Sequence, residues 1–88
     1  MLKIDTASPA PGAVTIVLSG WIRREHLPEL QALVADAAAR GRRISLDLRD
    51  VGLADREAVE FLASAIRGRA RLLHCPPYLR TWLRSIVG

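Results

Sequence analysis

Three charged residues, Asp55, Arg56 and Glu57, stand together a few residues after the alternating segment Ile44–Leu48 and at the start of a segment with helical spacing. An aspartate at the first position of a helix accepts hydrogen bonds from the free amides of the first turn. An arginine in that turn opposes the positive end of the helix dipole, at a cost of a few tenths to about 1 kcal/mol. Two interpretations are open: a solvated cluster that neutralises itself, or a surface that a partner recognises.

Catalytic and metal chemistry find little support in the sequence. His26 stands alone, and His74 and Cys75 are neighbours on a predicted strand, so their side chains point to opposite faces. The glycines lack the spacing and the lysine of a phosphate-binding loop, and no serine lies in a recognisable nucleophile turn. We therefore predict a domain that is not an enzyme and that has neither a cofactor nor a metal site.

The composition is that of a globular protein of 88 residues, of which 50% are hydrophobic and 25% are charged. We expect one domain that spans residues 1–88, because a chain of this length supports a single core. The formal net charge of +4 comes from charges that are spread along the chain. Nucleic acid is not an expected partner, because neither a basic block nor a pattern of stacking aromatics is present.

The sequence also predicts a cytoplasmic location. Cys75 is the single cysteine, which excludes an internal disulfide and favours a reducing compartment. The N-terminal segment has no apolar run typical of a signal peptide, and no stretch approaches the roughly 20 apolar residues of a membrane span, so no membrane insertion is expected. The amphipathic C-terminal segment "YLRTWLRSIVG" is interpreted as a helix that closes the core rather than one that lies on a membrane.

The spacing of apolar residues predicts an α/β fold with the order β-β-α-β-α-β-α. Strands are expected at Leu2–Asp5, Ala13–Ser19, Ile44–Leu48 and Ala70–Cys75, and helices at about Leu27–Arg40, from Asp55 or Arg56 to Arg67, and from Pro77 onward. The first two strands are expected to be antiparallel, and the others parallel through right-handed crossovers. A four-stranded mixed sheet with helices mainly on one face follows.

In such a sheet, sites usually form where strands give way to helices. Asp47 or Asp50 is expected there beside Asp55, and Gly20–Arg24 is expected to be a connection that ends at the same place. We therefore predict a partner-binding surface made of Asp50, Asp55, Arg56, Glu57, Trp21, Arg23 and Arg24. The opposite pole carries arginines near the ends of two helices, where cations offset the helix dipole; these are Arg40, Arg42, Arg43, Arg67, Arg69 and Arg71.

The order of elements and the motif "LDLRDVGLAD" resemble a STAS domain, the fold of bacterial anti-sigma-factor antagonists. The resemblance covers nearly the whole chain and includes the strand end Leu18–Gly20. In that family an aspartate, matched by Asp55, is followed by a serine or threonine whose phosphorylation ejects the partner. Arg56 stands at the position of that hydroxyl, so the resemblance implies that the usual switch is lost.

The resemblance implies a non-enzymatic, protein-binding module in a bacterial regulatory pathway. Its partner would be a protein similar to an anti-sigma kinase, or a subunit of a larger complex. Two alternatives are an accessory subunit of a transporter, and a nucleotide- or anion-sensing domain in which Arg23, Arg24 and Arg56 supply the positive charge. A third is phosphorylation at another hydroxyl, such as Ser45 or Ser64.

Overall fold

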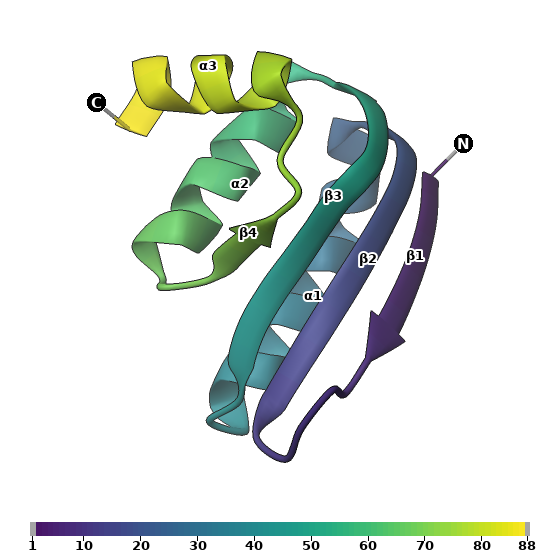
Figure 1. Cartoon of the computed structure of the whole chain (residues 1–88), viewed down its shortest axis with the longest axis vertical. Coiled ribbons are helices and arrows are strands. Elements are labelled where there is room, and N and C mark those ends of the chain that lie inside the picture. Colours follow the sequence, from purple (N-terminus) through teal and green to yellow (C-terminus); the bar gives the residue numbers. More distant parts are fainter. Residues whose placement is uncertain (1, 88) are drawn as a thin grey trace.

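The computed structural model describes residues 2–87, and its elements follow the predicted order (Figure 1). The strands are β1 (Leu2–Ala7), β2 (Ala13–Ile22), β3 (Arg43–Ala54) and β4 (Arg71–Leu73). The helices are α1 (Leu27–Ala39), α2 (Arg56–Arg67) and α3 (Pro77–Val87), and a short 3₁₀ helix, η1 (Arg24–His26), precedes α1.

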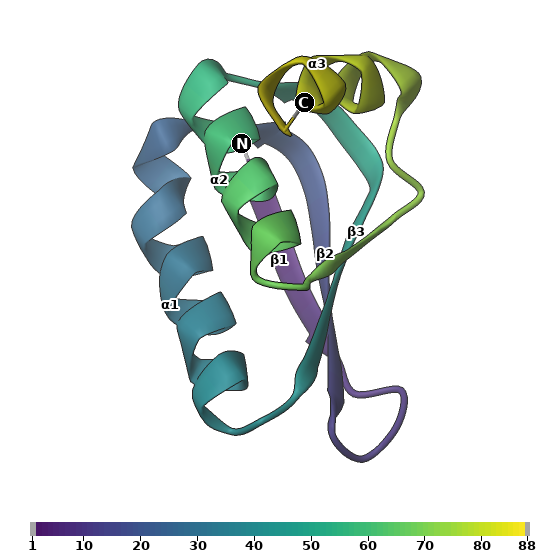
Figure 2. The same cartoon turned by 90° about the vertical axis from the view of Figure 1, so that its left-hand side faces the viewer.

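The sheet confirms the predicted mixed topology. Its order is β1-β2-β3-β4, with β1 antiparallel to β2 and the other two pairs parallel. Because the strands lie in chain order, both crossover helices fall on the same face. Figure 2 shows α1 and α2 on one side of the sheet, whereas α3 lies across its upper end and leaves the rest of the other side without a helix. One broad face of the sheet is therefore largely uncovered.

The core lies between the sheet and the helices, and it follows the alternation of the strands. Ile16 and Leu18 of β2 and Leu46 and Leu48 of β3 are at most 1% exposed. Burial of an aliphatic side chain of this size contributes roughly 1.5–3 kcal/mol. Leu79 of α3 is also fully buried, so the C-terminal helix closes the core as predicted.

Strands β2 and β3 run past the ends expected from sequence, Ser19 and Leu48. The reason is a pair of irregularities in their register, between Val17 and Ser19 and between Gly20 and Trp21, which leave β3 with 12 residues against 10 in β2. Bulges of this kind break the alternation that marks a strand in sequence. The prediction that residues 20–24 form a connection is therefore wrong for its first three residues, which belong to β2.

Strand β4 is shorter than the predicted Ala70–Cys75 and ends at Leu73. His74 adopts a φ of +53°, which is incompatible with a strand. Its Nε2 lies 2.8 Å from the Nη2 of Arg49.

Within residues 2–87 no group of three or more His, Cys, Asp or Glu side chains is arranged to hold a metal ion. None of the helices described has the length and apolarity that a membrane crossing needs.

Two helices end in the same hydrogen-bonded motif at the pole opposite Asp55. After α1, the N–H of Arg42 donates to the carbonyl of Ala37 at 3.0 Å, and Gly41 takes the left-handed conformation, with a φ of +68°, as predicted. After α2, the N–H of Ala70 donates in the same way to Ala65 at 2.9 Å. Here the left-handed residue is Arg69, with a φ of +70°.

Gly20, whose φ is +106°, stands at the second register irregularity near the end of β2. We expect Gly20→Ala to lower the free energy of unfolding by about 1–3 kcal/mol, because a side chain at this φ is strained. Gly52→Ala is the matched control, since no atom lies within 4 Å of the added Cβ, and its effect should not exceed about 1 kcal/mol. Urea unfolding measures both, and equal losses would contradict the assignment of strain to Gly20.

Candidate functional site

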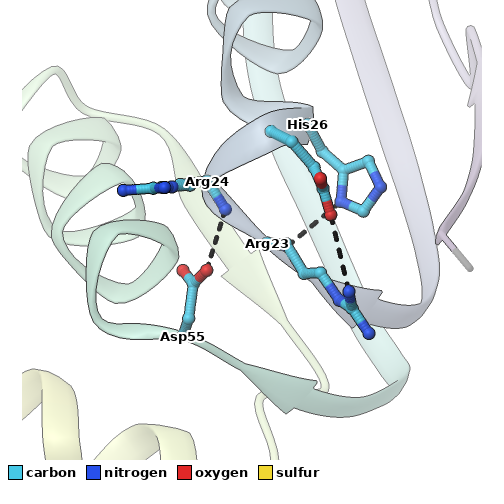
Figure 3. A network of polar contacts seen from close by, with 5 residues as sticks. Arg23, Arg24, His26 and Asp55 are labelled. Atoms are coloured by element: carbon cyan, nitrogen blue, oxygen red, sulfur yellow. Dashed lines mark hydrogen bonds and ion pairs between the residues drawn. The ribbon is translucent and has the colours of Figure 1, made fainter.

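The carboxylate of Asp55 joins the two connections that meet at the strand-to-helix pole. One oxygen accepts from the N–H of Ala58 at 2.9 Å, which caps α2 as predicted. The other accepts from the N–H of Arg24 at 2.8 Å, in the connection after β2 (Figure 3). The N–H of Asp55 itself donates to the carbonyl of Ile22 at 3.1 Å. One residue thus ties the start of α2 to the end of β2.

The connection after β2 is held by contacts of its own. The N–H of Arg23 donates to Nδ1 of His26 at 3.1 Å. The guanidinium of Arg23 lies 3.6 Å from the ring centroid of Trp21, and its Nη1 lies 3.6 Å from a carboxylate oxygen of Glu25. The guanidinium of Arg23 therefore stacks on the indole of Trp21, a contact of the cation–π type.

Arg56 is the first residue of α2, and its Nε lies 3.8 Å from Oε2 of Glu60, one turn along the helix. Arg56 therefore pairs with a residue outside the charged trio, and both interpretations of the trio stay open. Asp55 uses its carboxylate on backbone amides, and in the part of the chain that the structure describes Glu57 takes part in no ion pair. Arg56 and Glu57 present their charges to solvent.

Three large hydrophobic residues are exposed in the described chain, and they lie around this pole. Trp21 is 38% exposed and pairs in register with Leu53, which is 55% exposed. Tyr78, at the start of α3, is 41% exposed and donates its hydroxyl to the carbonyl of Val51 in β3 at 3.1 Å. Desolvation, together with the charge of Cys75, raises the pKa of the Tyr78 phenol above its usual value.

Sequence reasoning missed Leu53 and Tyr78. The segment that contains Leu53 was predicted to be a turn, because the register shift interrupts the alternation of polar and apolar residues in β3. A signal for Tyr78 existed, since it falls outside the apolar stripe of the last helix that contains Leu79 and Leu83. An aromatic residue on the polar side of an amphipathic helix is a sign of a contact surface.

The structure brings most of the predicted site together, with Asp55 beneath it. We call this surface the rim, and it consists of Trp21, Arg23, Arg24, Leu53, Arg56, Glu57 and Tyr78. Asp50 lies inside β3 rather than in a turn before α2, and its side chain is exposed. It stands opposite Ser19 and next to Val51, whose carbonyl accepts from Tyr78, so it borders the rim.

Residues 6–85 match the family described as "Mlab, STAS domain". The chain belongs to the STAS family. This assignment confirms the resemblance that the motif around Asp55 indicated, and the matched segment contains the whole rim. No curated protein matches the sequence of this STAS domain.

Solved structures agree on the fold. The anti-sigma factor antagonist SpoIIAA in its unphosphorylated form is 18% identical, and the alignment covers 93% of this chain and 82% of that one with a TM-score of 0.77. The structure named Mglu is 19% identical over 83% of this chain and 19% of its own length, with a TM-score of 0.67. An uncharacterised protein of the DUF3478 family from Shewanella loihica PV-4, with a SpoIIAA-like fold, is 12% identical over 75% of this chain and 57% of its own, with a TM-score of 0.55.

The geometry of Asp55 predicts that its role is structural. Asp55→Ala removes acceptors from two amides and should lower the free energy of unfolding by about 2 kcal/mol. Arg56→Ala is the control from the next position, where loss of an exposed ion pair should change stability by less than about 0.5 kcal/mol. Chemical unfolding followed by circular dichroism measures the free energy of unfolding of both variants. An unchanged value for Asp55→Ala would show that the two hydrogen bonds do not stabilise the fold.

Proposed function

We propose that this STAS domain is a protein-binding module without catalytic activity, and that it docks its partner through the rim. The observation that carries the proposal is the position of Trp21, Leu53 and Tyr78. These are the large hydrophobic residues that stay exposed within residues 2–87, and they gather at the ends of β2 and β3, where Trp21 pairs with Leu53 and Tyr78 donates to the carbonyl of Val51. Tryptophan, tyrosine and arginine are the residue types most enriched among those that dominate binding energy at protein interfaces.

The arrangement supports a preformed docking surface. Arg23 stacks on Trp21, and Asp55 hydrogen-bonds to the backbone of Ile22 and Arg24 on either side of Arg23. A surface that is already ordered loses less conformational entropy when a partner binds. The charges of Arg56 and Glu57 flank the exposed side chains, where they would steer the partner and set its orientation more than add raw affinity.

The function that fits this surface is that of a bacterial regulatory domain of the anti-sigma-antagonist type. SpoIIAA, which shares the fold, is an anti-sigma factor antagonist. In the present chain Arg56 stands at the helix position where the family resemblance places the phosphorylated hydroxyl, and arginine offers no oxygen to a kinase. We therefore infer a cytoplasmic binder whose docking is not switched at position 56.

The alternatives differ in how well the rim supports them. A subunit of a transporter complex would use the same docking surface, so the identity of the captured partner separates it from the regulatory function. An anion site made of Arg23, Arg24 and Arg56 is less favoured, because two of these side chains already have partners in Glu25 and Glu60. Phosphorylation at Ser45 or Ser64 stays a prediction, which mass spectrometry of the native protein would test.

Affinity capture from cells that express the protein, with mass spectrometry of the bound fraction, tests the docking proposal. Trp21→Ala should weaken binding of the captured partner about thirtyfold or more, as expected for a central aromatic contact. Arg56→Glu should reduce the association rate, because it reverses a charge on the docking surface. Both variants should keep the thermal stability of the parent within a few degrees.

Arg67→Glu is the matched control, because it makes the same charge reversal on the last residue of the same helix. It should leave partner binding within about twofold, since long-range effects of one exposed charge are screened by salt. If Arg67→Glu weakens binding as much as Arg56→Glu, only net charge matters. If Trp21→Ala has no effect on the isolated partner complex, docking through the rim is wrong.

A further inference from the structure

A second group of polar side chains lies at the other pole, on the uncovered face of the sheet. Thr15 of β2, Ser45 of β3 and Arg71 of β4 are paired in register and form one row across three strands. Arg43 stands two residues before Ser45 on β3 and therefore on the same face. Arg69, in the turn that leads into β4, completes the group.

The side chains of Arg43 and Arg71 point away from the face of the sheet that the helices cover. Ile44 is buried and Leu72 packs against the core, so the neighbouring Arg43 and Arg71 project to the face that carries no helix. Compensation of the helix dipole, which sequence analysis favoured for this pole, does not account for Arg71, which lies on a strand and faces away from the helices. It still suits Arg69, which directly follows α2.

The group surrounds a cavity of about 350 Å³ that Thr15, Arg43, Ser45, Arg69 and Arg71 line together with apolar residues. Cavities of this size lie at the lower end of those that hold small ligands. None of its three arginines takes part in an ion pair with any acid of the described residues. Asp5 and Asp47 share this face but belong to the next row, paired through Val17.

Arg69 reaches this group from an unfavourable backbone conformation. A left-handed arginine costs roughly 1–2 kcal/mol relative to the favoured regions, and glycine would remove that cost. The equivalent position after α1 is occupied by Gly41. The fold thus accepts strain at the one helix end whose side chain lines the cavity.

We propose that this cavity is a binding site for an anion that carries a diphosphate group. Three guanidinium groups supply the positive charge and can form paired hydrogen bonds to phosphate oxygens. The hydroxyls of Thr15 and Ser45, which line the same cavity on neighbouring strands, add neutral donors. Two linked phosphates carry more negative charge than one phosphate, so a diphosphate matches the three positive charges of the cavity more closely.

The site is independent of the rim. It lies at the N-terminal ends of β3 and β4, whereas the rim lies at the C-terminal ends of β2 and β3. Ligand binding here and protein docking there involve no common residue. The two proposals can therefore fail separately.

Titration of the whole chain with inorganic pyrophosphate at constant ionic strength, followed by NMR, tests the proposal. Saturable shifts are expected at the amides of Thr15, Ser45 and Arg71. The double variant Arg43→Gln/Arg71→Gln should weaken binding at least tenfold, because it removes two charged donors. The control Arg67→Gln/Arg84→Gln removes the same charge from helix surfaces and should bind within about twofold of the parent.

Further ligands identify the source of the diphosphate group. ADP that binds more tightly than pyrophosphate would support a nucleoside-linked diphosphate, and ADP that binds more weakly would support a free one. Sulfate at the same ionic strength should bind at least tenfold more weakly than pyrophosphate. Shifts that do not saturate, equal losses in the two double variants, or binding only to vesicles of anionic lipid would overturn the proposal.

Discussion

The hydrogen bonds of Asp55 are the constraint on which the strand-to-helix pole depends. Its carboxylate satisfies one amide at the start of α2 and one in the connection after β2, which lies 31 residues earlier in the chain. The other contacts of the connection, from Arg23 to His26, Trp21 and Glu25, are local and do not reach α2. The link keeps Trp21 and Arg56 at a fixed separation although they belong to different layers, and this fixed separation is what makes a preformed docking surface physically reasonable.

A sheet covered on one side has two kinds of surface to offer. The covered face is filled with aliphatic side chains, and the open face keeps the polar half of each alternating strand. At one end of the open face, the register irregularities carry β2 and β3 far enough to place Trp21 beside Leu53. At the other end, regular pairing lines up Thr15, Ser45 and Arg71. The two ends therefore differ in chemistry although they belong to the same strands.

Charge follows the same division. At the rim, arginines have partners close in sequence, such as Glu60 for Arg56, so the surface is of mixed sign and suited to a protein. At the opposite pole, Arg43 and Arg71 have no acid within ion-pair distance among residues 2–87. Concentrated charge without a partner carries a repulsion that a bound anion would relieve. The formal net charge of +4 is therefore distributed unevenly, which the composition alone does not reveal.

The sequence by itself determined the element order, the inward face of each strand, the cap at Asp55 and the left-handed turn at Gly41. These features depend on residues a few positions apart, so local periodicity is enough to predict them. The tertiary structure decided where β3 ends, that Asp50 lies within a strand, and that Trp21 and Leu53 are neighbours. Those features depend on register between strands that a helix separates along the chain, and register is set by packing and bulges that leave no short-range pattern.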